Sequence, residues 1–245
     1  MTIAVISQSM YLPWIGLLNQ IKLADIYIHY DDVQLSRGFY NRVQVNSKQG
    51  SSLITIPLTG KKHKQRIDET IVNNSIDWVQ KHRKVIYNSL SKSPYFHDAI
   101  NIFDLIHKNK SKKLSDINQA SILALVDYCK ILPSENFYCA TDFSPIGKSS
   151  ERLLDICKKA EVTEYLTGHG ALNYLDHALF EKNGIDVYYI NYNFKKYIPS
   201  NSFYTPYVSA LDPIANLGDT ITSTMLSKMI HWTEAIKCPE KLIPL

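Results

Sequence analysis

Cysteine is scarce in this sequence, and the few cysteines are not arranged as a metal site or a disulfide framework. They lie far apart and form no C-x-x-C pair: Cys129, Cys139, Cys157 and Cys238. Zinc sites and compact disulfide frameworks need closely spaced cysteines. We therefore expect reduced structural thiols and predict no metal site.

Long apolar runs are missing too. No stretch of about 18 apolar residues, long enough to span a bilayer, occurs in the chain. The first residues, MTIAVISQS, have no basic region ahead of an apolar stretch, as a secretory signal would. These absences predict a cytoplasmic protein with no membrane partner.

Several common motifs of nucleotide and acyl chemistry are also absent. The sequence has no Walker A loop, no G-x-G-x-x-G fingerprint and no G-x-S-x-G elbow. The usual signatures of phosphate-binding loops and serine hydrolases are therefore missing.

Positive charge is modest and locally concentrated. The formal net charge is +4, with much of the excess in two clusters, Lys61, Lys62, Lys64 and Arg66, and Lys108, Lys110, Lys112 and Lys113. A nucleic-acid-binding face would spread basic residues with exposed aromatics between them, so we expect no nucleic-acid partner. Each cluster is either a solvated loop or a contact to a phosphate-bearing small molecule.

The composition and the first apolar segments predict an α/β fold. Hydrophobic residues make up 45% and charged residues 20% of the chain, which is typical of a packed core. The run IAVIS (3–7) indicates a buried strand of a parallel sheet. Pro13 fits the first turn of a helix that follows, and IYIHY (26–30) indicates a second strand.

The remaining segments extend this pattern. We expect a hairpin of strands over 42–45 and 52–58 with Gly50 in its turn, and a helical insertion over about 75–130. Further elements are listed in chain order: a helix over 147–160, a strand over 162–168, a helix over 171–183, a strand over 185–190 and a last helix over 217–229. The prediction is a single α/β domain over 1–245, with a mostly parallel Rossmann-like sheet and helices on both faces.

In such sheets, ligands bind beyond the carboxyl ends of the strands. Loop 7–14 and segment 31–37 fall at that edge. Gln8 could hydrogen-bond a sugar or a base, or satisfy a turn, and Tyr11 and Trp14 could form an aromatic wall or belong to the core.

Charged candidates lie nearby in the sequence. Asp31 and Asp32 could act as a general base, orient a hydroxyl or cap a loop. Arg37 and Arg42 suit phosphates through paired hydrogen bonds, or form surface ion pairs.

Two later loops add candidates. The basic loop 60–66 brings Lys61, His63 and Lys64 after a strand, where it could close on a diphosphate. His169 and Gly168 lie in TGHG, a strand-to-helix turn that permits close backbone approach to a ligand. The histidine could carry protons near neutral pH.

Several segments resemble the WbqC-like protein family. The matches are QSMYLPWIG, ADIYIHYDDVQLSRGFYNR, LITIPL, EYLTGHGALNYLD and FYTPYVSALDPIANLG. The resemblance adds these residues to the expected substrate site: Gln34, Asn41, Tyr174, Ser209 and Asp212. Ser9 departs from the family pattern, where proline is expected, and we expect this to loosen the loop slightly.

The family is associated with gene clusters for bacterial O-antigens and other surface polysaccharides. The resemblance implies work on a nucleotide-linked sugar, often an amino sugar that is later N-acylated. Our first hypothesis is a transferase or ligase that attaches an acyl or aminoacyl group to the sugar amine, with Asp31 or His169 as base.

Alternative hypotheses stay open. The chain could hold sugar nucleotides without catalysis, activate a carboxylate with ATP as some nucleotide-binding α/β ligases do, or have an unrelated regulatory role. The cofactor is undetermined between ATP and an acyl donor, and a homodimer is possible.

Overall fold

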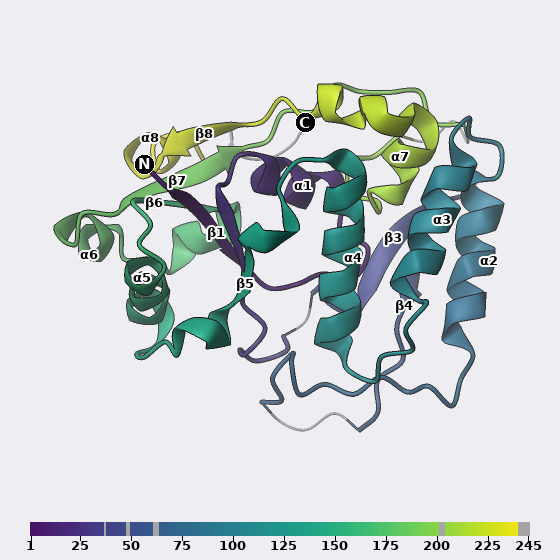
Figure 1. The fold of residues 1–245 in the computed structure, drawn as a ribbon. Coiled ribbons are helices and arrows are strands. Elements are labelled where there is room, and N and C mark those ends of the chain that lie inside the picture. The colour runs from purple at the N-terminus through teal and green to yellow at the C-terminus, as the bar shows by residue number, and fades with distance from the viewer. Residues whose placement is uncertain (37, 48–49, 61–63, 201–203, 240–245) are drawn as a thin grey trace.

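A sheet of six strands lies at the centre of the computed structural model, which describes residues 1–36, 38–47, 50–60, 64–200 and 204–239 (Figure 1). The strands follow the spatial order β5 (Phe137–Cys139), β2 (Ile26–His29), β1 (Ile3–Ser7), β6 (Glu164–Thr167), β7 (Asp186–Asn191) and β8 (Lys228–His231). All neighbours pair in parallel except β7 and β8, which are antiparallel.

The order of these strands is that of a doubly wound nucleotide-binding fold. Counted along the chain within this sheet, the spatial order is 3-2-1-4-5-6, the Rossmann order. The predicted fold class, a mostly parallel Rossmann-like sheet, is confirmed.

The strands are apolar on both faces because helices cover both. Val5 and Tyr27 belong to one buried cluster, while Ala4, Ile6 and Ile28 belong to another. Helices α1 (Ile15–Lys22) and α4 (Leu114–Cys129) contribute to the first cluster, and α5 (Ser149–Lys159) and α6 (His177–Lys182) to the second. In Figure 1, α5 and α4 accordingly lie on opposite sides of β1.

The long connection from β2 to β5 holds the hairpin and the helical block that the sequence predicts. Strands β3 (Arg42–Ser47) and β4 (Gly50–Thr55) form an antiparallel pair closed by Ser47 and Gly50. Gly50 has φ of +120°, a conformation that favours glycine. Helices α2 (Trp78–Leu90), α3 (Phe96–Ile106) and α4 occupy the range 75–130.

Three predicted helix positions are wrong, each for a local reason. Pro13 lies before the N-cap Trp14 rather than inside α1, and its carbonyl accepts from the N–H of Ala210. The helix expected over 171–183 is split: a 3₁₀ turn (His169–Asn173) comes first, and Asp176 then caps α6 by accepting from the N–H of Leu179.

The helix expected over 217–229 is wrong as well. Helix α7 (Leu211–Leu217) ends at Gly218, which has φ of +60°. A Cβ there would lie 2.8 Å from the Tyr95 ring, so this glycine allows a close approach as well as the turn. A 3₁₀ segment (Gly218–Thr224) and β8 follow, and α8 (Trp232–Ala235) is the last helix described.

A buried polar cluster ties the loop after β1 to the helical block. The Tyr11 hydroxyl lies 3.0 Å from Nδ1 of His82 and 3.4 Å from Nε2 of His107, and the Tyr11 ring packs edge-on against Trp78. Burial lowers the pKa of His82 to about 4 and also lowers that of His107. Both imidazoles are therefore neutral at pH 7.

This cluster predicts acid sensitivity of the fold. The pKa of His82 falls from 6.5 in the unfolded chain to about 4 in the folded protein. The contribution of His82 to the free energy of unfolding is therefore complete above pH 6.5 and is lost as the pH falls towards 4. We expect the destabilisation caused by His82→Gln at pH 7 to shrink by about 3 kcal/mol at pH 4, measured by urea unfolding.

The matched control is His97→Gln, because His97 is exposed on α3. As an exposed substitution, it should change the free energy of unfolding by less than about 0.5 kcal/mol at pH 7. A wild-type to His82→Gln difference that stays constant from pH 7 to pH 4 would contradict the assignment.

Candidate functional site

A cavity of about 620 Å³ opens where the sheet changes winding direction, between the carboxyl ends of β1 and β6. Doubly wound sheets bind ligands at this position, because the connections leave the two neighbouring strands on opposite sides. The described residues lining it are Ile6, Ser7, Gln8, Met10, Trp14, Leu17, Gln20, Tyr30, Tyr40, Leu153, Tyr165, Thr167, Gly168, His169, Gly170, Ala171, Tyr174, Tyr192 and Tyr207.

The loop after β1 supplies one wall. Gln8 follows the last residue of β1, and its side-chain Oε1 accepts a hydrogen bond from the Tyr40 hydroxyl. Asn118 of α4 donates to the main-chain carbonyls of Ser9 and Tyr40 at 2.9 Å each. The amide of Gln8 and the phenol of Tyr40 thus form a fixed polar pair at the cavity.

Trp14 forms an aromatic wall with residues from the C-terminal part of the chain. Its ring stacks on Tyr207 at 5.6 Å between centroids and contacts Tyr192 at 5.0 Å and Phe194 at 5.9 Å. A Cβ on Gly16 would lie 2.3 Å from the Trp14 ring. The glycine that accompanies this tryptophan in the sequence is therefore needed to make room for the ring.

His169 lies in the turn that follows β6 and lines the cavity opposite the loop after β1. Its ring is 5.2 Å from that of Tyr192, and its Nε2 is buried without a hydrogen-bond partner. Burial lowers the pKa of His169 below its usual value. The imidazole is therefore neutral at pH 7, and His169 lines the cavity while its Nε2 is buried.

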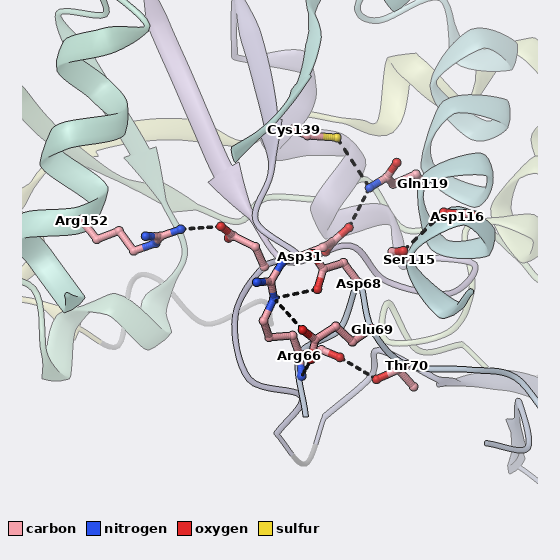
Figure 2. Close-up of polar contacts among 11 residues, drawn as sticks. Asp31, Arg66, Asp68, Glu69, Thr70, Ser115, Asp116, Gln119, Cys139 and Arg152 are labelled. Atoms are coloured by element: carbon pink, nitrogen blue, oxygen red, sulfur yellow. Dashed lines mark hydrogen bonds and ion pairs between the residues drawn. The ribbon is translucent and has the colours of Figure 1, made fainter. Parts of the chain in front are cut away.

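Asp31 is buried and does not line the cavity, and Figure 2 shows its contact with Gln119. Its carboxylate accepts from the N–H of Ser9 at 2.8 Å, from the Ser9 hydroxyl at 2.7 Å and from the amide of Gln119 at 2.9 Å. Burial raises the pKa of Asp31 despite these bonds. Both oxygens are engaged in holding the loop.

The expectation that Ser9 loosens this loop is wrong. Ser9 is fully buried, and besides its two bonds to Asp31 its hydroxyl lies 2.8 Å from Nδ1 of His29. Proline has no N–H to donate to Asp31. In this chain serine anchors the loop more firmly than proline could.

Asp32 is paired with a cation from across the sheet. It forms an ion pair with Arg152 of α5, whose guanidinium also donates to the carbonyl of Pro145 and lies 5.9 Å from the Tyr30 ring centre. Next to this pair, Arg66 is held by Asp68 and Glu69 (Figure 2). The two neighbouring acids therefore have different partners: Asp31 binds the loop after β1, and Asp32 binds Arg152.

Other expected site residues lie elsewhere. Tyr11 is fully buried in the polar cluster with His82. Asn41 donates to the carbonyl of Ile56, and Arg42 lies in β3 with its Nε buried and without a partner. None of these three residues lines the cavity.

Of the candidates that the resemblance adds, some line the cavity and others do not. Tyr174 lines it, as does Gly168 of the TGHG turn, whereas Gln34 is exposed. Ser209 is buried beside Trp14, and Asp212 accepts from Asn46 at 2.7 Å and from the Tyr197 hydroxyl.

The basic loop does not reach the cavity within the described part of the chain. Lys64 is exposed with φ of +59° and does not line the cavity. Arg37, Lys61 and His63 lie outside the described residues.

Several cavity residues were not singled out from the sequence. Tyr30 and Tyr192 directly follow β2 and β7, so the strand-end rule that selects Gln8 would also have found them. Tyr40, Tyr207 and Gln20 had no comparable local signal. Tyr40 and Tyr207 reach the cavity because the connection from β2 to β5 and the C-terminal segment fold back, whereas Gln20 lies in α1 and donates to the carbonyl of Leu166.

Within the described residues, no group of three or more His, Cys, Asp and Glu side chains could hold a metal ion. Nor does the described part of the chain contain a helix with the length and apolarity needed to cross a membrane.

Comparison with known proteins gives a family and one relative. The model of the WbqC-like protein family matches residues 8–224. The "Uncharacterized protein Rv1507c" of Mycobacterium tuberculosis is 30% identical over 217 residues, which cover 87% of this chain and 93% of that protein. No solved structure matches the chain.

The role of Asp31 as a loop anchor can be tested by Asp31→Asn. An amide presents one oxygen and an NH₂ group to three donors, so we expect a loss of about 2 kcal/mol in the free energy of unfolding. Glu69→Gln, at an exposed neighbouring carboxylate, should change it by less than about 0.5 kcal/mol. Equal stability of the two variants in urea unfolding would refute the anchor.

The packing of Trp14 on Gly16 can be tested by Gly16→Ala. Trp14 is confined by Tyr192, Phe194 and Tyr207, so the added methyl should cost about 1–3 kcal/mol of stability. Gly170→Ala is the matched control, since a Cβ there meets nothing within 4 Å. Thermal and urea unfolding of both variants measure the difference, and an unaffected Gly16→Ala protein would show that the ring can move aside.

Proposed function

This chain belongs to the WbqC-like protein family, and we propose that it is an enzyme that acylates the amino group of a nucleotide-linked sugar. The sugar would be one destined for a bacterial surface polysaccharide. The observation that carries the catalytic part is that His169 lines the cavity and has a buried Nε2 without a hydrogen-bond partner.

The cavity suits a nucleotide-linked sugar in position, size and lining. It lies at the ligand-binding edge of a doubly wound sheet, and about 620 Å³ falls within the usual range of small-molecule sites. Trp14 and the tyrosines offer flat apolar faces for a base or a sugar ring. Gln8 and Tyr40 offer an amide and a hydroxyl for orienting sugar hydroxyls.

The charge of the lining argues for recognition by stacking and hydrogen bonding. No lysine, arginine, aspartate or glutamate is among the described residues that line the cavity. Arg152 stands just behind Tyr30 and is held by Asp32. In this proposal the diphosphate points towards the open side of the cavity, while the sugar occupies the aromatic part.

His169 is the proposed general base. A sugar amine must lose a proton when it becomes an amide, and a neutral imidazole with a free nitrogen can accept it. The lowered pKa keeps this imidazole neutral at pH 7. Asp31, the other candidate, has both oxygens bound to Ser9 and Gln119.

The reaction needs an activated acyl donor, such as a thioester or an acyl adenylate. The amine nitrogen attacks the acyl carbonyl carbon and forms the C–N bond. The bond between that carbon and the leaving group then breaks. His169 takes the proton from the nitrogen and passes it to the leaving group, so the products are the amide and the protonated leaving group.

A binding component without catalysis is the second candidate, and the position of Asp31 favours it. Asp31 anchors the loop and does not line the cavity, and the described cavity lining contains no carboxylate that could assist the reaction. Turnover therefore decides between the two functions.

The test incubates the protein with UDP- and dTDP-linked amino sugars and either acyl-coenzyme A thioesters or free acids with ATP, and follows product mass. We expect amide formation that has reached its pH plateau by pH 7. His169→Gln should lower turnover at least about 100-fold while the affinity for the sugar nucleotide changes less than about threefold.

His97→Gln, on the surface of α3, is the matched control and should retain full turnover. If a sugar nucleotide binds and none of these donors gives an amide, the binding function is established instead. Full activity of His169→Gln would remove His169 from the mechanism.

A further inference from the structure

A second cavity of about 300 Å³ adjoins the first. Met10, Trp14 and Tyr207 line both cavities, so these three side chains form the partition between them. The other described lining residues are Tyr11, Pro13, Phe39, Val43 and Gln44. The second cavity is therefore built by the loop after β1, strand β3 and the C-terminal segment.

The lining of the second cavity is almost entirely apolar. None of its described lining residues carries a formal charge, and Gln44 is the one that has an amide side chain. The hydroxyl of Tyr11 lies 3.0 Å from Nδ1 of His82, which gives it a polar partner within the protein. The surface offered to a ligand is thus made of aromatic rings, the Val43 and Pro13 side chains and the Met10 thioether.

The partition has a defined geometry. Trp14 and Tyr207 stack with their centroids 5.6 Å apart and their planes inclined by 24°. Gly16 makes room for the indole beside α1. Trp14 and Tyr207 are therefore fixed at the border of the two cavities.

We infer that the second cavity binds the uncharged acyl chain of the donor, with the acyl carbonyl at the Met10, Trp14 and Tyr207 partition. This assignment rests on the proposed function. It places the acyl carbonyl at the edge of the partition, where the sugar amine in the first cavity would reach it to form the C–N bond.

The chemistry of the lining also selects among donors. An aliphatic chain gains free energy from leaving water for such a surface. A glycyl donor would bring an ammonium group into a cavity that has no described anionic partner for it, which is costly. The donor class is therefore a simple aliphatic acyl group rather than an aminoacyl group.

The test uses small neutral amides as probes of the acyl chain: acetamide, propionamide, butyramide and pentanamide, with cationic glycinamide for comparison. Binding is followed by NMR of the methyl groups of Val43 and Met10. We expect affinity to rise about fourfold per methylene until the cavity is full, and glycinamide to leave these signals unchanged.

Two variants test the location. Val43→Phe fills the cavity from β3 and should weaken butyramide binding at least about tenfold, because the overpacked cavity excludes the chain. The matched control is Leu53→Phe, because Leu53 lies in the same hairpin, is half exposed and is not among the residues that line the cavity. It should change the affinity less than about twofold.

Should Val43→Phe fail to fold, Phe39→Ala serves instead, since Phe39 is 50% exposed and also lines the cavity. It should weaken butyramide binding about threefold through lost contact area. Affinity that is independent of chain length, or unchanged in whichever of these two variants folds, would overturn the inference, as would glycinamide binding equal to that of butyramide.

Binding of UDP-glucosamine to the same proteins separates the two proposals. If the acyl-chain probes bind as expected but no sugar nucleotide binds to the first cavity, the second cavity stands as an acyl-binding site and the proposed function fails. If amide formation occurs from a glycyl donor and the probes do not bind, the proposed function stands and this inference fails.

Discussion

The contact between Asp31 and Ser9 is the constraint on which the candidate site depends. A carboxylate buried at the end of β2 accepts two hydrogen bonds from the loop that leaves β1 and one from Gln119 of α4. Removing so many polar groups from water is tolerated only because each is paired. The pairing fixes the path of the loop, and with it the positions of Gln8 and Trp14 at the cavity.

The long connection between β2 and β5 is part of the same arrangement. Asn118 of α4 holds the carbonyls of Ser9 and Tyr40 together, and the Tyr11 hydroxyl reaches His82 of α2. The helical block and hairpin therefore brace the site loop from behind and carry Tyr40 to the cavity. A Rossmann-like sheet alone would leave this side of the cavity, at the carboxyl ends of β1 and β6, open.

Aromatic side chains, rather than a phosphate-binding loop, dominate the lining of both cavities. In the proposed function, stacking and a few hydrogen bonds take the place of the backbone amides that a G-x-G-x-x-G loop gathers around a diphosphate. The shared layer of Met10, Trp14 and Tyr207 gives the site two compartments of different polarity.

The sequence by itself determined the fold class and several residues of the cavity lining, because these follow from local apolar patterns and from a general rule about parallel sheets. It did not predict β5 or β8, which are short strands of three and four residues. It selected Gln8, Trp14, Gly168, His169 and Tyr174, all of which line the cavity. Only the tertiary structure decided that Asp31 is an anchor, that Arg42 and Asp212 lie away from the cavity, and that Tyr40 and Tyr207 belong to it. The reason is physical: a side chain's role depends on which distant partner satisfies it, and such partners are chosen when segments far apart in sequence pack together.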